Sequence, residues 1–357
     1  MAGKFKWEKF NNINLNDSFF DSLKNDYPEF TEWFHKKSRM GEETLVYNDD
    51  LGIGAFLYLK DEEEPLELSN ITLPARKRVK IGTLRLSERQ RGIRLGEGAI
   101  GVALWKWRDK QVDEIYVTIF EKHTKLIRLF ERFGFKKIGN NKRGECVYIK
   151  NRKNIDYSNP YTAFPFIRPD FKKAGVIPIS ENFHDKLFPY SELMGNKKQI
   201  EEITAGNGIT KIYIGTPYTP MHYEIGEPVG IYRKYEGSSG ATYKSVITSY
   251  ATITKIVSIK KNYSYLYTLN DFLIKVGNKS VFSVDELTSI YYSKGSNVEM
   301  IEMVYNGFFG KGNNINHKKL YSNGLFSDHP YKIDYTKEQF IKILEMGEAN
   351  VQNIIID

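Results

Sequence analysis

The residues of this chain with the clearest chemical potential lie in the segment 89–96, which reads RQRGIRLG. It connects a predicted strand over residues 79–86 to a predicted helix over residues 96–110. The first N–H groups of a helix have no partner inside the helix, so they can bind an anion. Glycine lets the backbone approach a ligand closely. The segment therefore predicts a site for a phosphate group, to which three arginines add positive charge: Arg89, Arg91 and Arg94.

A second strand and helix follow about thirty residues later. Residues 114–120 (EIYVTIF) have the pattern of a buried strand, and residues 121–135 have that of an amphipathic helix that ends at Gly134, a plausible left-handed cap. Residues 145–150 predict one more strand. The apolar face of the helix is formed by four residues at helical spacing: Leu126, Leu129, Phe130 and Phe133.

These two elements resemble the GNAT family of N-acetyltransferases over roughly residues 40–150. The family's cofactor loop is usually R-x-x-G-x-G, and residues 91–96 keep its first Arg and last Gly but place Arg94 where the middle Gly is usual. The family's second motif is a helix that ends L-Y-E-K-x-G-F, which matches LFERFGF at 129–135. The order and spacing of loop, strand, helix and G-F ending carry the resemblance.

The resemblance implies a mixed-sheet α/β domain that binds acetyl-CoA. The backbone of the 91–96 loop and its arginines would hold the pyrophosphate, and N–H groups near Leu84 and Leu86 would polarise the thioester carbonyl. Phe130 would face the thiol. The implied cofactor residues are Leu84, Leu86, Arg89, Arg91, Gly92, Ile93, Arg94, Leu95, Gly96 and Phe130.

The sequence departs from the family at the proton-transfer step. The family's frequent general acid is the Tyr of L-Y-E-K, but Phe130 occupies that position and has no proton to donate. His123 matches the Asn that usually opens the same helix, and an imidazole titrates near neutral pH. We therefore predict His123 as the first catalytic candidate, followed by Glu121 and Tyr148. No histidines or cysteines have the spacing of metal ligands, so we expect no metal site.

Composition indicates two domains in 357 residues, which we place at 1–150 and 175–357 with a linker at 151–174. No apolar run is long enough to cross a membrane, and the single cysteine, Cys146, fits a reducing, cytoplasmic setting. Charge is uneven. Residues 1–64 hold 8 Lys and Arg against 14 Asp and Glu, whereas residues 76–150 hold 20 against 8. The basic surplus thus falls on the predicted cofactor domain and could also attract an anionic acceptor.

The second half predicts a small mixed β-barrel built from short strand patterns, at 211–214, 228–232, 243–250 and 251–258, followed by helical ones. It resembles the PUA-like superfamily, which includes ASCH and EVE domains, through KIYIGTP at 211–217, GEPVGIYR at 226–233 and the run from 243 to 256. This resemblance implies binding of RNA or modified bases. We expect substrate contacts from a basic and aromatic run: Tyr232, Arg233, Lys234 and Tyr235.

Three functions are compatible with these observations. The first is an N-acetyltransferase whose PUA-like half presents an RNA or nucleoside acceptor. The second keeps the enzyme but takes a protein amine or small amine as acceptor, with the barrel as scaffold. The third, motivated by Phe130, is a non-catalytic module that binds CoA or nucleic acid.

Overall fold

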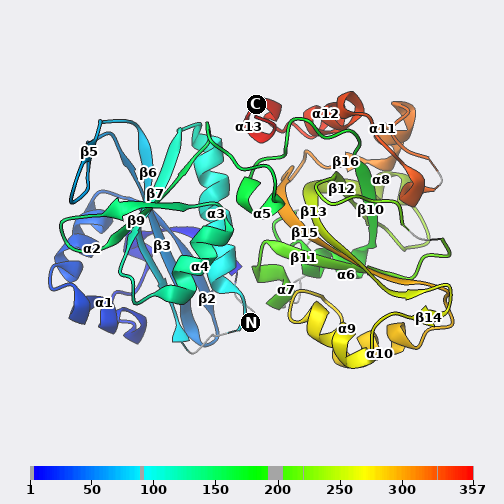
Figure 1. Cartoon of the computed structure of the whole chain (residues 1–357), viewed down its shortest axis with the longest axis horizontal. Coiled ribbons are helices and arrows are strands. Elements are labelled where there is room, and N and C mark those ends of the chain that lie inside the picture. Colours follow the sequence, from blue (N-terminus) through cyan, green and yellow to red (C-terminus); the bar gives the residue numbers. More distant parts are fainter. Residues whose placement is uncertain (1–3, 89–91, 192–203, 220, 328, 357) are drawn as a thin grey trace. The chain divides into compact units, whose positions relative to one another are not determined.

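The computed structural model of the chain describes residues 4–88, 92–191, 204–219, 221–327 and 329–356. It divides into two compact units, residues 1–155 and residues 156–357 (Figure 1). Each unit has its own sheet and its own core.

In the described part of the first unit, one mixed sheet has the strand order β1-β2-β3-β6-β7-β9-β8. Neighbouring strands are antiparallel except for β6 and β7, which are parallel. The mixed sheet with helices confirms the predicted α/β class. The strands are β1 (Lys4–Lys9), β2 (Glu43–Asp49), β3 (Gly52–Glu62), β6 (Arg78–Leu86), β7 (Glu114–Ile119), β8 (Lys136–Asn140) and β9 (Cys146–Asn151), and β4 (Leu66–Glu67) pairs separately with β5 (Thr72–Leu73).

Two pairs of helices flank this sheet (Figure 1). On one side, α1 (Asp21–Asp26) and α2 (Phe30–Arg39) follow the 3₁₀ turns η1 (Phe10–Asn12) and η2 (Ser18–Phe20), and together they bury an aromatic cluster against β3. On the other side, α3 (Leu95–Lys110) and α4 (Thr124–Arg132) cover the opposite face. Phe10 illustrates the aromatic packing, since its ring meets those of Phe34, Phe56 and Tyr58 edge to face at 5.0–5.8 Å.

The element α4 begins later than the sequence predicted. The helical pattern was expected from residue 121, but the helix starts at Thr124, because the backbone of His123 (φ −86°, ψ 48°) is not helical. The helix ends beside Gly134, as the sequence predicted. Gly134 adopts a left-handed φ of +81° directly after the helix, as its cap position requires.

The second unit contains one sheet with the order β10-β12-β13-β15-β11, to which β14 and β16 add short pairings with β13. Its edge strands β10 and β11 do not pair with each other within the described residues, so the predicted mixed β-barrel takes the form of a curled, open half-barrel. The two predicted strands at 243–258 are one continuous strand, since no Gly or Pro interrupts them. The strands are β10 (Gly175–Ser180), β11 (Thr210–Gly215), β12 (Pro228–Lys234), β13 (Val246–Lys261), β14 (Ser264–Tyr265), β15 (Val298–Phe308) and β16 (Ile315–Asn316).

Helices surround this curled sheet, and three of them match the predicted helical stretches: α9 (Leu269–Val276), α10 (Val284–Tyr291) and α12 (Lys337–Met346). Each of the three begins with a capping box, in which the N-cap hydroxyl and the N3 side chain exchange hydrogen bonds with the backbone. The other helical segments are α5 (Pro160–Ala163), α6 (Glu181–Leu187), α7 (Thr204–Asn207), α8 (Ala241–Lys244), α11 (His317–Ser322), η4 (Pro330–Lys332) and α13 (Val351–Ile354).

Most of the predicted linker at 151–174 packs on the second unit. Its first residue, Asn151, ends β9, and residues 156–174 belong to the second unit. Phe164, Phe166 and Ile167 are buried there, and Ile167 N–H donates to the Ile354 carbonyl at 2.8 Å. The prolines of this segment indicated irregular structure correctly, but its aromatic side chains bury it in the core.

Candidate active site

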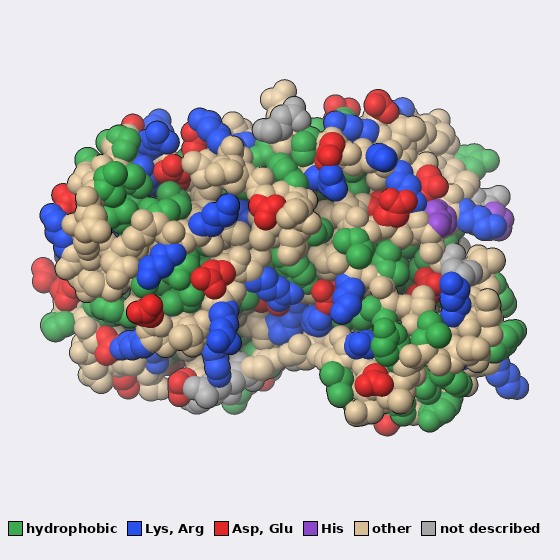
Figure 2. All heavy atoms as spheres, viewed as in Figure 1, with side chains coloured by type: hydrophobic (Ala, Val, Ile, Leu, Met, Phe, Trp, Pro, Cys, Tyr) green, Lys and Arg blue, Asp and Glu red, His purple; other side chains and the backbone are tan. Residues whose placement is uncertain are grey.

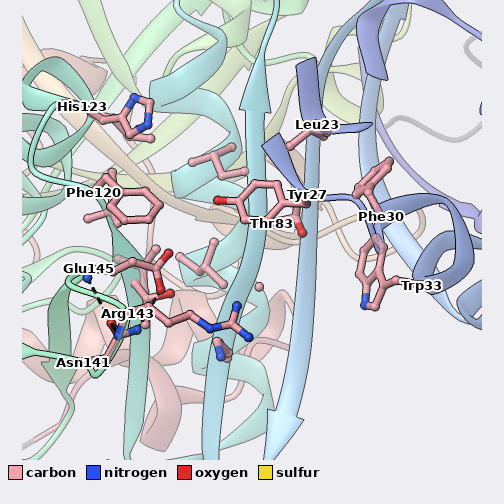
Figure 3. Close-up of a pocket in the computed structure, with 18 of the residues that line it drawn as sticks. Leu23, Tyr27, Phe30, Trp33, Thr83, Phe120, His123, Asn141, Arg143 and Glu145 are labelled. Carbon is pink, nitrogen blue, oxygen red and sulfur yellow. Dashed lines mark hydrogen bonds between the residues drawn. The ribbon is translucent and has the colours of Figure 1, made fainter. Parts of the chain in front are cut away.

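The parallel strands β6 and β7 separate in the middle of the first sheet. Their pairing covers only residues 78–81 of β6 and 114–117 of β7, although both strands continue beyond it. A cavity of about 470 Å³ lies at this opening. Its walls come from β6, β7, the N-terminal part of α4, the helices α1 and α2, and the turn between β8 and β9 (Figure 3).

Leu84 and Leu86, the predicted thioester residues, lie on β6 beyond the point of separation. Ser87 N–H donates to the Gly54 carbonyl of β3 at 2.8 Å, and backbone groups of neighbouring strand residues alternate between the two edges. The N–H groups of Leu84 and Leu86 therefore face the edge away from β3, where β7 no longer pairs with β6. Leu84 also lines the cavity.

The loop before α3 is described from Gly92 onward, and Arg89 and Arg91 lie outside the described residues. Gly92 has a left-handed φ of +86°, and a Cβ added there would meet no atom within 4 Å, so its requirement for glycine is conformational. Ile93 is half-buried, and Leu95 is buried as the first residue of the helix. A strand, a left-handed turn and a helix of 16 residues thus follow in the predicted order.

The Arg94 side chain, predicted to contact the pyrophosphate, forms an ion pair within the start of α3. Its guanidinium is mostly buried and donates to Glu97 one turn along α3, with an Nη2–Oε1 distance of 2.8 Å. This places the cation on a buried carboxylate rather than in the open turn. Its backbone has a left-handed φ of +63°, the conformation that glycine adopts most easily. That geometry agrees with the position of the family's middle glycine.

Gly96 is required for packing between elements. A Cβ at Gly96 would come within 3.0 Å of Leu86 Cδ1 on β6 and 3.3 Å of Leu129 Cδ2 on α4. The absence of a side chain lets the start of α3 approach both neighbours. Its backbone φ lies outside the left-handed region, so close approach, and not conformation, explains this glycine.

Two predicted residues of α4 line the cavity, and two catalytic candidates do not. His123, exposed at the N-cap of α4, and Phe130, fully buried, both contribute to the wall. Glu121 is exposed and outside the lining. Tyr148 is buried on β9, outside the lining as well, and its hydroxyl donates to Glu131 Oε1 at 3.4 Å. Desolvation first, and then the Glu131 charge, raises the pKa of Tyr148.

Six further lining residues were not selected from the sequence. Tyr27, Phe30 and Trp33 come from the α1–α2 segment, and Asn141, Arg143 and Glu145 come from the β8–β9 turn (Figure 3). The aromatic side chains at 27–34 are visible in the sequence, but core packing explains such a pattern equally well. The polar turn carries no signal, because nothing local indicates which hairpin faces the cavity.

In the second unit, the predicted run Tyr232–Tyr235 does not form an exposed strip. Tyr232 packs in the core with its hydroxyl 3.1 Å from His317 Nδ1, and Arg233 is buried in ion pairs with Asp185 and Glu181 on α6. Lys234 is exposed, and Tyr235 is partly exposed with Lys244 Nζ 4.4 Å from its ring centre. Consecutive side chains of a strand point to opposite faces, and here both faces are covered: Tyr232 lies in a core cluster and Arg233 lies against α6.

The described residues contain no group of three or more His, Cys, Asp or Glu side chains placed to hold a metal ion. Nor does any described helix combine the length and apolar character needed to cross a membrane.

Comparison with solved structures returns N-acetyltransferases at low sequence identity. An N-acetyltransferase of Staphylococcus aureus is 13% identical, with a TM-score of 0.33, and covers 42% of this chain and 99% of its own. Arabidopsis thaliana NAA60, solved with acetyl-CoA, is 15% identical, with a TM-score of 0.32, and covers 42% and 100%. The PaiA N-acetyltransferase of Thermoplasma acidophilum, solved with coenzyme A, is 13% identical, with a TM-score of 0.31, and covers 42% and 99%.

No family model matches the chain, and no curated protein matches its sequence. Because these identities lie below 25% and the TM-scores below 0.5, the function has to be inferred from the geometry of the site itself.

Proposed function

We propose that the first unit is an acetyl-CoA-dependent N-acetyltransferase. The single observation that carries the proposal is the separation of β6 from β7 beside a cavity of about 470 Å³, at the strand edge where Leu84 and Leu86 direct their N–H groups. Hydrogen-bond donors fixed at such an edge suit a carbonyl oxygen that gains negative charge during acyl transfer.

The residues present fit acetyl-CoA in two places. The N-terminus of α3, with Gly92 in a left-handed conformation before it, offers backbone N–H groups to a pyrophosphate. The opening between β6 and β7 is lined by Leu126 and Phe130 of α4, whose apolar surfaces suit the pantetheine arm. When bound, acetyl-CoA would supply the activated acetyl group.

Calorimetry with acetyl-CoA and an assay for thiol release test the proposal together. We expect micromolar binding by the wild type and thiol release when an amine is added. Arg94→Ala should weaken binding by about 1–2 kcal/mol, because the start of α3 loses the ion pair with Glu97 that fixes it. Absence of acetyl-CoA binding would contradict the proposal.

Nucleic-acid binding by the second unit is a second candidate function. Although Tyr232 and Arg233 are buried, tyrosines are exposed elsewhere, around β14, α9 and α10, where hydrophobic side chains gather in Figure 2. One lysine accompanies them, with Lys275 Nζ 4.3 Å from the ring centre of Tyr267, whereas Lys260, 5.2 Å from the ring centre of Tyr265, is buried and donates to the Ser293 carbonyl. We name this the tyrosine surface, defined by Tyr263, Tyr265, Tyr267 and Tyr292.

Exposed rings beside a lysine suit stacked bases with neighbouring phosphates. Carboxylates share the region, but those of Asp271 and Glu286 accept hydrogen bonds in helix capping boxes. We expect Tyr263→Ala with Tyr265→Ala to weaken binding of single-stranded RNA at least about tenfold, whereas Tyr235→Ala changes it little. A fluorescence titration at two salt concentrations measures this. An equal loss of RNA affinity in both variants would place the binding site at the predicted run, residues 232–235.

A further inference from the structure

The outer face of α4 carries a row of positive charge. Lys125, Arg128 and Arg132 are all exposed, and their spacing of three and four residues places them on one side of the helix. The apolar side of the same helix lies opposite, where Ile127 and Phe130 are buried. We name Lys125, Arg128 and Arg132 the basic stripe. At a rise of about 1.5 Å per residue, the stripe is about 10 Å long.

Carboxylates do not balance the charge of the basic stripe. Residues 121–137 hold six Lys or Arg against two Glu. Within the described part of the chain, the side chains of Lys125 and Arg128 form neither an ion pair nor a hydrogen bond. The nearest helix carboxylate, that of Glu131, accepts from the Tyr148 hydroxyl on β9 at 3.4 Å, so it turns toward the sheet.

Other exposed lysines of the first unit are neutralised locally. Lys142 pairs with Glu67 at 2.6 Å, and Lys153 pairs with Asp113 at 2.5 Å. The basic stripe therefore differs from an ordinary charged surface, in which cations and carboxylates alternate. Its charge remains available to an anion from outside the chain.

The basic stripe begins next to the cavity of the candidate active site. Phe120 and His123 line the cavity just before α4 (Figure 3), and Lys122 Nζ lies 5.8 Å from the ring centre of Phe120. Lys125 follows two residues after His123. A ligand that lies along the stripe thus meets the cavity at the N-terminal end of the helix.

The chemistry of the stripe fits the phosphates of a double helix. Every large apolar side chain of α4 is at least partly buried, so the helix offers no exposed ring on which an unpaired base could stack. Nor can it lie in a membrane surface by its apolar side, which packs in the core. A double-stranded nucleic acid carries one charge per about 1.7 Å of its axis, so several phosphates fall within the length of the stripe.

We propose that the basic stripe binds the double-stranded stem of a folded RNA through its phosphates, without reading the sequence. A folded RNA offers a paired stem to the stripe and unpaired bases to the tyrosine surface, whereas duplex DNA offers only the paired part. The docking itself does not depend on acetyl transfer. That the stripe directs the RNA toward the cavity, where an amine carried by the RNA is acetylated, rests on the proposed function.

Fluorescence anisotropy of the full chain with a labelled RNA hairpin tests the docking. Titrations between about 50 and 200 mM salt give the slope of log affinity against log salt, to which each phosphate contact contributes about 0.9. Lys125→Gln with Arg128→Gln should lower the affinity about tenfold and make that slope shallower by about 2. Duplex DNA of the same length should bind more weakly than the hairpin.

A matched pair of cations on another helix provides the control. Lys36→Gln with Arg39→Gln removes two exposed cations of α2 with the same spacing, in a part of the sequence where carboxylates outnumber cations. It should change neither the affinity nor the slope. All four side chains are exposed, so both double variants should melt at the wild-type temperature.

Two further measurements separate the stripe from the other candidate sites. Calorimetry should give wild-type acetyl-CoA affinity for Lys125→Gln with Arg128→Gln, because the stripe holds RNA and not the cofactor. With bulk cellular RNA as acceptor, the same variant should raise KM about tenfold and leave kcat unchanged. Tyr263→Ala with Tyr265→Ala should leave the salt slope for the hairpin unchanged.

An unchanged slope in the stripe variant, an equal loss in the α2 variant, or tighter binding of duplex DNA would overturn the docking. Weaker acetyl-CoA binding by the stripe variant would overturn it too, because the stripe would then serve the cofactor phosphates. Binding to anionic vesicles without binding to the hairpin would replace RNA by a membrane. If the wild type binds the hairpin as expected but does not bind acetyl-CoA, the docking stands and the proposed function fails. If it binds both but transfers no acetyl group to RNA, the direction toward the cavity is wrong.

Discussion

At the scale of single residues, Phe130 belongs both to the core and to the wall of the cavity. The side chain is fully buried, packs edge to face on Phe135 at 5.0 Å, and still contributes to the cavity wall. One ring therefore belongs to the core and to the lining at once. A tyrosine at this position would carry its hydroxyl on Cζ. That hydroxyl reaches the cavity only if Cζ, and not the side of the ring, faces the cavity.

We expect Phe130→Tyr to leave the melting temperature nearly unchanged and to maintain or raise the acetylation rate, because the hydroxyl gains access to the cavity. Phe133→Tyr is the matched control: Phe133 is equally buried on the next turn but does not line the cavity, so a hydroxyl there should cost about 1–3 kcal/mol. Thermal denaturation and turnover, measured for both variants, show whether the added hydroxyl reaches the cavity or is buried in the core. Equal destabilisation of both variants would show that Phe130 serves the core alone.

A buried carboxyl in the second unit gives a pH prediction. Burial raises the pKa of Glu227 to about 7, although Lys173 Nζ lies 3.7 Å from its carboxylate, and no described residue forms a hydrogen bond with its Oε1. The folded state thus binds the proton more tightly than the unfolded state. The contribution to stability is fully present below about pH 4.5, the ordinary pKa of this group, and is lost as the pH rises through about 7.

We therefore expect Glu227→Gln to stabilise the second unit by about 1–2 kcal/mol at a pH of about 8.5 and to have little effect at about pH 4.5. Denaturant unfolding at the two pH values measures the difference. Glu63→Gln, an exposed carboxyl in the first unit, serves as control. Equal stabilisation at both pH values would mean that the substitution acts through packing and not through ionisation.

Some residues of the site could be selected from the sequence, and others could not. Gly92, Gly96, Leu84 and Leu86 could be selected from a local motif, because strand, turn and helix are contiguous in the chain. Tyr27 and Glu145 could not, since they come from distant segments that only the folded sheet brings to one cavity. Arg233 was misplaced for the same reason: its carboxylate partners lie on α6, about fifty residues earlier.

At the scale of elements, the start of α3 is a packing junction as well as a predicted anion site. The helix meets Leu86 of β6 and Leu129 of α4 at Gly96, and it is covered at its first turn by the Arg94–Glu97 pair. Periodicity predicted the helices α3 and α4 and the strands β6, β7 and β9 of this unit, because each is locally amphipathic or apolar. It could not predict that β6 and β7 separate, which depends on what packs between them.

We expect Gly96→Ala to destabilise the first unit by about 1–3 kcal/mol and to weaken acetyl-CoA binding, because its Cβ would push α3 away from β6. Gly92→Ala makes a different change, since its Cβ meets no atom within 4 Å but its left-handed φ of +86° strains an alanine by about 1–2 kcal/mol. Calorimetry and thermal denaturation compare the two. Wild-type affinity in Gly96→Ala would exclude this junction from the cofactor site.

At the scale of the whole molecule, the two units differ in what their sequences revealed. The first unit follows a motif order that fixes its topology. The second was predicted as a small mixed β-barrel from short strand patterns. Its strand β13 runs unbroken for 16 residues and shifts its register against β15 at three places. Such irregularities curl a sheet without closing it. Local patterns do not contain the pairing that decides between the two outcomes.

The boundary between the units gives the last prediction. A fragment of residues 156–357 should fold alone with a single cooperative transition, because it contains its own sheet and core. A fragment of residues 175–357, which follows the predicted linker, should be destabilised by more than about 4 kcal/mol. It loses Phe164, Phe166 and Ile167, which are fully buried, and burial of each large apolar side chain contributes about 1.5–3 kcal/mol. The Asn306 side chain would also lose the Pro165 and Phe166 carbonyls that it binds at 3.3 and 3.2 Å. Urea denaturation of the two fragments under identical conditions provides the comparison. Similar urea midpoints would show that residues 156–174 lie on the second unit without contributing to the stability of its core.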